Sequence, residues 1–235
     1  MPTNTTEQAQ IIPAAYYRTG IAVGITLAFW LATVLSLGGA GLLVTTAGQL
    51  PIPIAIGVML PIIVFVWLYR NSPSFKNWVL TAPAALITAL MAWRFAGLGF
   101  LALYAHQVLP GMFAWPAGVG DIIIGIMAPW LAMRLVRQPR YINNRFFIAW
   151  NWFGIIDLVI AIATGALGSL LATGAAGEIT TKPMALLPLS IIPTFLVPLM
   201  VMLHITILLK AKHYRADNQQ GSAMNAKPIH SRRVL

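Results

Sequence analysis

The dominant pattern along the chain is a series of long apolar runs separated by short polar or turn-forming segments. Each run approaches or exceeds the ~20 residues that an α-helix needs to cross the hydrocarbon core of a bilayer. The pattern therefore predicts an all-α fold, a bundle of six transmembrane helices within residues 17–210. A polar segment, 1–16, precedes the bundle, and a basic tail, 211–235, follows it and is expected to be disordered. The helices are expected at about 19–44, 51–69, 84–106, 116–135, 146–171 and 185–209.

Two stretches depart from simple apolar runs. Residues 71–83 mix aromatic, apolar and charged side chains: Phe75, Lys76, Trp78 and Leu80. They fit either a short interfacial segment or the first turns of a tilted third helix, and Pro83 favours a break before residue 84. The last apolar run contains three prolines: Pro188, Pro193 and Pro198. Each proline removes a backbone hydrogen bond, so this helix is expected to be bent or broken.

Composition supports a membrane location and excludes several kinds of chemistry. The chain is 59% hydrophobic and 9% charged, whereas soluble domains are about one quarter charged. With its compact loops, this composition favours the cytoplasmic membrane of a bacterium. The absence of cysteine excludes disulfides, thiolate metal sites and cysteine nucleophiles. Motifs of hydrolases, zinc proteases and nucleotide-binding proteins are also missing, so we assign no catalytic residue, metal or cofactor and favour a non-enzymatic role.

The positions of the basic residues predict the orientation. If both termini are cytoplasmic, every Lys and Arg lies on the cytoplasmic side except Lys182, which is outside, and Arg94, which is within a helix. This is the bias of the positive-inside rule, and it explains the net charge of +10 without nucleic acid as a partner. We expect the bilayer itself as the partner, with anionic lipid at the basic loop and tail. Gly20 and Gly24 form a GxxxG pattern, which leaves a homo-oligomer open.

Three charged residues lie inside predicted helices: Arg94, Asp121 and Asp157. A charge at the centre of a membrane helix costs roughly 2.5–3.5 kcal/mol, so such residues pair with one another and often mark a functional site. Both carboxylates share a helix face with small residues, which predicts that they point into the bundle. Arg94 and Asp157 fall near the midplane and Asp121 lies ~8 Å closer to the outer face. The sequence leaves open whether Arg94 pairs with Asp121 or with Asp157.

These residues, together with His204 near the inner end of the last helix, form the candidate site for a substrate or ion. The leading hypothesis is a small-solute or ion permease, with proton coupling as one form of it. The alternatives are a non-transporting scaffold that assembles with or modulates a partner, and an intramembrane enzyme acting on lipid. Transport predicts a water-accessible cavity around Asp121 and Asp157, a scaffold predicts a dry, closed ion cluster, and a lipid enzyme predicts a lateral opening between helices.

Overall fold

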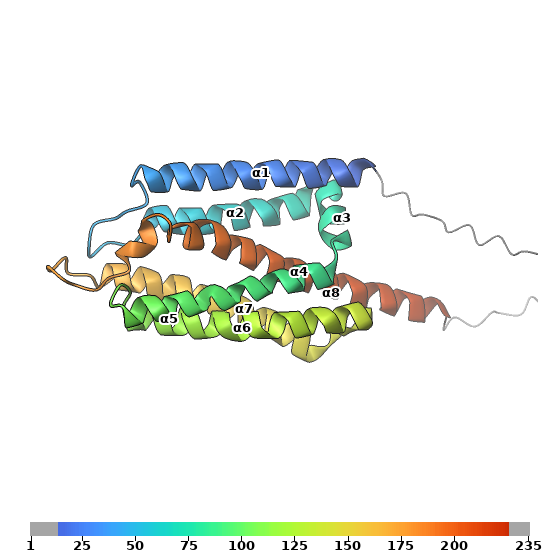
Figure 1. The fold of residues 1–235 in the computed structure, drawn as a ribbon. Helices are drawn as coiled ribbons and strands as arrows, with labels where there is room; N and C mark the ends of the chain where they lie inside the picture. The colour runs from blue at the N-terminus through green and yellow to red at the C-terminus, as the bar shows by residue number, and fades with distance from the viewer. Residues whose placement is uncertain (1–13, 226–235) are drawn as a thin grey trace, which may run out of the picture.

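The computed structural model describes residues 14–225, and every regular element within them is helical (Figure 1). Six of its helical stretches are long and apolar enough to cross a membrane, which suggests a multi-pass membrane protein. They are α1 (Ala14–Gly39), α2 (Ile52–Asn71), the composite Ala84–Ala105, α6 (Gly111–Arg137), α7 (Arg145–Leu170) and the last stretch from Ile192, which includes α8 (Val197–Asn225). The expectation of an all-α bundle is confirmed at this level; its orientation in a membrane stays a prediction.

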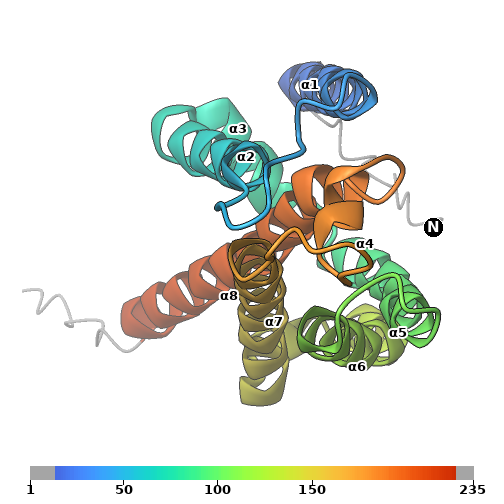
Figure 2. The ribbon, with the colours of Figure 1, turned by 90° about the vertical axis from the view of Figure 1, so that its left-hand side faces the viewer.

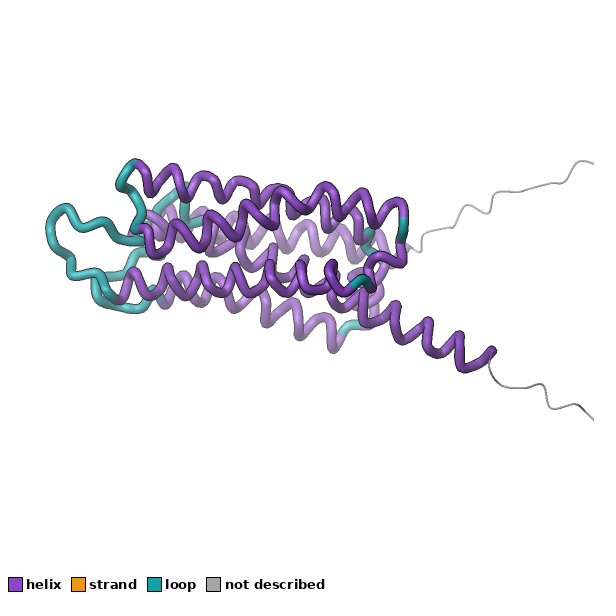
Figure 3. The backbone as a smooth tube through the Cα atoms, turned by 90° about the horizontal axis from the view of Figure 1, so that it is seen from below, coloured by secondary structure: helices purple, strands orange, loops and turns teal. Residues whose placement is uncertain are grey.

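The long helices run side by side along one axis, with the longer loops at one end and the first turn of α1 and the last turns of α8 at the other (Figures 1 and 3). Viewed along that axis, α1, α2 and α3 (Pro73–Thr81) lie on one side, and α4 (Ala84–Leu90), α5 (Leu98–Ala105), α6 and α7 lie on the other (Figure 2). The last stretch passes between the two groups and contacts α2, α3, α4 and α7. It is therefore the central element of the bundle.

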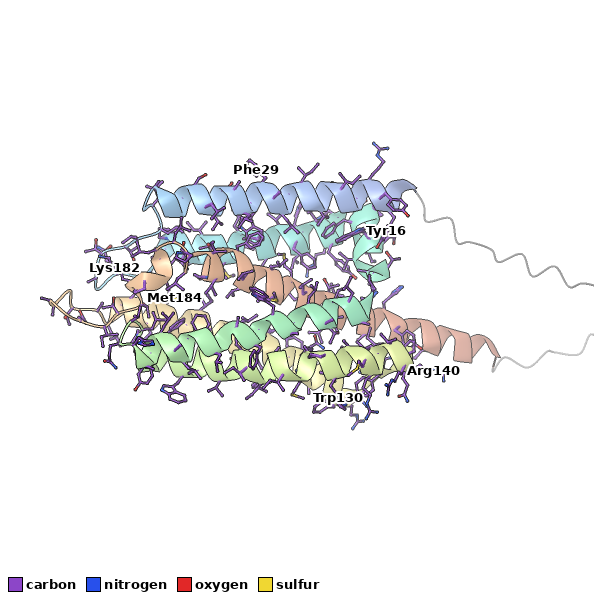
Figure 4. The ribbon with its side chains drawn as sticks, viewed as in Figure 1. Tyr16, Phe29, Trp130, Arg140, Lys182 and Met184 are labelled. Carbon is purple, nitrogen blue, oxygen red and sulfur yellow. The ribbon has the colours of Figure 1, made fainter. Side chains whose placement is uncertain are left out.

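Much of the outer surface is apolar. Ile21, Ile25 and Phe29 of α1 are exposed, and Phe29 points away from the bundle (Figure 4). In water such a surface would be unfavourable, but lipid-facing side chains of a membrane helix are apolar by necessity. The exposed apolar residues thus agree with the six-span interpretation of the sequence.

Residues 71–83 form a separate short helix, which settles the choice that the sequence left open. Helix α3 begins after Ser72, whose Oγ accepts a hydrogen bond from the Phe75 amide at 3.3 Å, and it ends before Pro83. It crosses the end of the bundle between α2 and α4 (Figure 1). Lys210 of α8 donates to the carbonyl of Leu80, which ties α3 to the central helix.

Several helix limits differ from those expected. Helix α6 begins at Gly111 rather than near 116, because Pro110 takes the N-cap position and Pro116 is tolerated inside the helix. Helix α1 runs over Ala14–Gly39 rather than 19–44. The segment 1–13 lies outside the described residues.

The last helix differs most. A 3₁₀ turn, η3 (Lys182–Ala185), and irregular backbone replace its expected start at 185, and a π-helical turn, η4 (Ile192–Leu196), precedes α8. Pro188 and Pro193 cannot donate backbone hydrogen bonds, which explains the irregular start. Helix α8 then continues to Asn225, so residues 211–225 are helical where a disordered tail was expected. Residues 226–235 of that tail lie outside the described part of the chain.

The apolar core is concentrated at the α3 end. Its largest cluster joins α4, α6, α7 and α8 through Ile87, Ile124, Leu131, Phe147 and Ile207, all of them buried. Arg140 lies at this end of the molecule and Lys182 at the other (Figure 4). The tightly packed half is thus the half that the positive-inside rule assigns to the cytoplasm.

Candidate functional site

Arg94 sits on a 3₁₀ segment in the middle of the third apolar span. This segment, η1 (Met91–Gly97), connects α4 to α5. A 3₁₀ helix has three residues per turn, so residues three apart lie on one face. Met91, Arg94 and Gly97 follow this spacing and are all buried, while Trp93 is 65% exposed. The tight turn therefore aims Arg94 straight into the bundle.

Glycines let η1 approach α6 at backbone distance. A Cβ at Gly125 would lie 2.3 Å from the Phe95 nitrogen, and one at Gly118 would lie 3.0 Å from the Gly97 carbonyl oxygen. Real Cβ atoms are not found as close as the first of these distances. Contacts between small residues of this kind are common where membrane helices pack closely. They fix the depth at which Arg94 enters the core.

The guanidinium of Arg94 binds both carboxylates. The sequence left open whether Arg94 pairs with Asp121 or with Asp157, and in the structure it pairs with both. Its Nε donates to Asp121 Oδ1 at 2.6 Å, and its Nη2 donates to Asp157 Oδ2. Its Nη1 donates to the Gly154 carbonyl at 3.1 Å and lies 3.2 Å from His204 Nε2. Arg94 is only 4% exposed, and its partners on α6, α7 and α8 surround it.

His204 completes the site through a residue that the sequence interpretation missed, Asn151 of α7. Its Nδ1 lies 3.0 Å from Asn151 Oδ1, and Asn151 Nδ2 donates to the Phe147 carbonyl at 2.8 Å. Arginine can only donate, so His204 Nε2 accepts from Arg94 and Nδ1 carries the proton that goes to Asn151. This hydrogen-bond pattern assigns His204 a neutral ring with the proton on Nδ1.

Asn151 could have been found from its position. It is an amide inside an apolar helix and lies three residues before Gly154, on the same helix face. It is fully buried, as is His204. A polar side chain at such a position needs partners, which is the argument that identified Arg94, Asp121 and Asp157.

Three further glycines make room for the charged side chains. A Cβ at Gly120 would lie 1.6 Å from Asp157 Oδ1, one at Gly154 would lie 2.3 Å from His204 Nε2, and one at Gly97 would lie 2.3 Å from Asp121 Cβ. The three positions belong to α6, α7 and η1, so three different elements provide the space around the charged side chains. The polar groups occupy space that a side chain at any of these positions would fill.

The charges of the cluster do not cancel when both carboxylates are ionised. Arg94 contributes one positive charge, Asp121 and Asp157 contribute two negative charges, and His204 is neutral in the pattern above. The side chain of Asp157 is 7% exposed and that of Asp121 is 16% exposed. Asp121 is therefore the carboxylate that a proton or another cation can reach.

A cavity of about 540 Å³ leads to Asp121 from the loop end of the bundle; we call it the axial cavity. Its outer part is lined by Thr45, Ala47 and Gly174, and its walls are mainly apolar and include Phe100 and Phe113. A second space of about 180 Å³, the side cavity, lies between η1 and the η4–α8 junction and is lined by Trp93, Leu196 and Met200 among others. Asp121 lines both cavities, and Asp157 and His204 line neither.

The site offers no set of ligands for a metal ion. Within the described residues, no three His, Cys, Asp or Glu side chains gather at one place. Asp121 and Asp157 are both held by Arg94, and His204 accepts from the same guanidinium. A guanidinium at the centre of the donor set occupies the position that a metal would need.

Comparison with known proteins places this site within a family. The model of a family described as "Domain of unknown function (DUF8737)" matches residues 51–211. That range contains Arg94, Asp121, Asn151, Asp157 and His204, and it leaves out α1 and the end of α8. No curated protein and no solved structure matches the chain. Because the matched range covers more than half of its length, the chain belongs to the DUF8737 family.

Proposed function

We propose that this protein is a permease of the bacterial cytoplasmic membrane that moves a small solute in exchange for protons. The observation that carries the proposal is the position of Asp121 at the floor of the axial cavity. Its cluster with Arg94 and Asp157 has a net charge of −1 when both carboxylates are ionised. Asp121 Oδ1 is bound by Arg94, and Oδ2 accepts no hydrogen bond from the described residues. The axial cavity reaches this carboxylate from the loop end, which the positive-inside rule places outside the cell.

Protonation gives Asp121 two distinct states. With Asp121 protonated, Arg94 and Asp157 form a neutral pair and the cluster is balanced. With Asp121 ionised, the cluster is balanced only when a cation occupies the cavity floor. Burying an unbalanced charge is costly. A proton and a positively charged solute therefore compete for the carboxylate of Asp121. This competition is the elementary requirement for coupling a solute to a proton gradient.

In transport by alternating access, the binding site is open to one side of the membrane and closed to the other. The two ends of the bundle differ in this way. The axial cavity opens at the loop end, and the cluster of Ile124, Leu131 and Phe147 fills the α3 end. Two irregular helical segments border the side cavity at the charged site: η1, which carries Arg94, and η4. Mid-helix 3₁₀ and π segments often mark hinges and functional sites, so movement at η1 and η4 is the means by which the closed end would open.

The test is transport by purified protein in liposomes. An imposed pH gradient and a panel of small cations, anions and neutral solutes would be screened for solute-induced proton flux with an entrapped pH dye. We expect flux with wild type and none with Asp121→Asn, which keeps an acceptor for Arg94 but cannot ionise. Asp217→Asn, which makes the same chemical change outside the range 51–211 that matches the family, is the matched control and should behave as wild type. Equal flux in wild type and Asp121→Asn, or none in wild type with any solute, would reject the proposal.

A second candidate, an enzyme acting on lipid, is favoured by one observation. The side cavity is lined by Trp93 and Ala96, which are exposed on the flank of the bundle, and it reaches Asp121. A lipid could therefore approach the carboxylate from the side. Overproduction of the protein should then change the lipid composition of the host in mass spectra, and Asp121→Asn should abolish the change. An unchanged lipid profile argues against this candidate.

A further inference from the structure

The lining of the axial cavity restricts the class of solute. Three of its residues are charged: Asp121 at the floor, and Glu178 and Lys182. The polar remainder consists mainly of Thr and Ser near the loops, and the deeper walls are formed by Phe100, Phe113 and Leu158 with other apolar residues. A volume of about 540 Å³ is within the range of small-molecule sites. The cavity therefore combines one deep negative charge with an apolar body.

Aromatic rings line the same cavity as this charge. Phe100 and Phe113 contact each other edge to face, with ring centroids 5.4 Å apart, and both rings line the axial cavity. Phe100 also lines the side cavity, as does Asp121. Aromatic faces attract ammonium groups through their quadrupole, most strongly where water is excluded. A carboxylate and an aromatic ring that line the same two cavities form a recognition pair for an organic ammonium ion.

We propose that the solute is a monovalent organic cation with an apolar body, an amine or quaternary ammonium compound. This inference rests on the proposed function, since it assigns a ligand class to the same site. One positive charge balances the cluster, whereas an anion would add to the excess negative charge. A bare metal cation needs several oxygen ligands, and the floor provides a single free carboxylate oxygen, Asp121 Oδ2.

The side cavity supports the same ligand class. It connects the flank of the bundle, at Trp93 and Ala96, with Asp121 and Arg94 at the level of η1. Apolar cations partition into membranes, so they can reach the carboxylate from the bilayer as well as through the loop end. A strongly hydrated solute has no reason to use such a route. Both cavities thus lead an amphiphilic cation to one oxygen.

Binding to purified full-length protein in detergent micelles tests the ligand class without any gradient. The probes are benzyltrimethylammonium, its uncharged isostere neopentylbenzene, and the anion benzylsulfonate, with thermal unfolding followed by tryptophan fluorescence. We expect a concentration-dependent rise in Tm with the cation alone. Asp121→Asn should weaken cation binding by roughly 30-fold or more, the cost of removing one partner of a buried charge pair. Asp217→Asn should leave it unchanged.

A second variant keeps the test informative if Asp121→Asn does not fold. Ala161→Phe places a ring inside the axial cavity, which Ala161 lines, and leaves the charges intact. It should also abolish the cation-dependent rise in Tm. Equal shifts with the cation and its uncharged isostere, or no shift with the cation in wild type, would overturn the inference.

The two proposals fail separately. Cation binding that depends on Asp121 without any transport in liposomes keeps the ligand class and rejects the permease. Proton-coupled transport of an inorganic monovalent cation, without binding of the organic cation, keeps the permease and rejects the ligand class.

Discussion

Substitution of Gly120 by alanine is the most direct test of the charged site, because the glycine faces Asp157 and not Arg94. The added Cβ would lie 1.6 Å from Asp157 Oδ1 and 2.3 Å from its Cγ. Asp157 would have to move, and its ion pair with Arg94 would break. Breaking a buried pair costs about 3–5 kcal/mol, while replacing a helical glycine by alanine gains about 1 kcal/mol. We expect Gly120→Ala to lower the free energy of unfolding by roughly 2–4 kcal/mol.

A double-mutant cycle identifies the cause of this loss. In an Asp157→Ala background, the atoms that clash with the new Cβ are gone, so Gly120→Ala should be neutral or should stabilise by up to about 1 kcal/mol. The coupling energy between the two positions is then about 2–5 kcal/mol. Unfolding free energies can be measured by detergent titration in mixed micelles, with tryptophan fluorescence as the signal.

Gly24 of α1 provides the control, because a Cβ there meets no atom within 4 Å. Gly24→Ala should leave stability unchanged or raise it by up to about 1 kcal/mol. If Gly120→Ala costs the same in the wild-type and Asp157→Ala backgrounds, Asp157 does not pack against Gly120. The geometry of the site described above would then be incorrect.

Three further predictions concern individual groups. Asn151→Leu removes the acceptor of the His204 Nδ1 proton and should lower the unfolding free energy by about 1–3 kcal/mol; an unchanged unfolding free energy would contradict this hydrogen bond. Asp121→Asn balances the cluster and should leave the unfolding free energy unchanged or raise it; a loss of more than about 2 kcal/mol would show that the ionised carboxylate is structural. Hydrogen bonds from the backbone amide of Thr173, and also from its hydroxyl and neighbouring amides, hold the pKa of Glu178 below its ordinary value. Their contribution to loop stability is present above the ordinary pKa of Glu178 and is lost as pH falls through the lowered pKa. The amides of this loop should therefore become less protected from hydrogen exchange at acidic pH, after correction for the intrinsic pH dependence of exchange. The Glu178→Gln variant should not show this pH-dependent loss of protection.

The candidate site could be predicted in part because charge in an apolar helix is conspicuous. Arg94, Asp121 and Asp157 were selected by the cost of burying them, and the structure brings all three together. His204 was included on weaker evidence, because a histidine near the end of a helix costs less to bury than a charge, and in the structure it also contacts Arg94. Asn151 was missed because an amide is less costly to bury than a charge, although it orients His204. The bonds of Arg94 to both carboxylates could not be derived from the sequence. The rise per residue of a helix gives the depth of each side chain in the membrane, but it does not give the rotation of one helix relative to its neighbours.

The limits of the helices were predicted less well at prolines and at the C-terminal end. Pro116 was taken as the start of a helix because proline favours first turns, but the helix already begins at Gly111, after Pro110 at its N-cap. The 3₁₀ turn at η1 had no signal in the sequence, because its apolar residues also fit an α-helix. In the folded bundle this segment lies against α6 at Gly125, and no local pattern in the sequence predicts that contact.

The sequence by itself determined the kind of protein: six apolar helices, a basic end, and a few buried charges that must find partners. These follow from local composition, since the transfer of apolar and charged groups between water and lipid depends on each segment alone. Only the tertiary structure decided which charges meet, that glycines on three elements make room for them, and that a cavity ends at Asp121 rather than Asp157. These features depend on the rotation and spacing of helices far apart in the chain, which packing fixes through many small contacts.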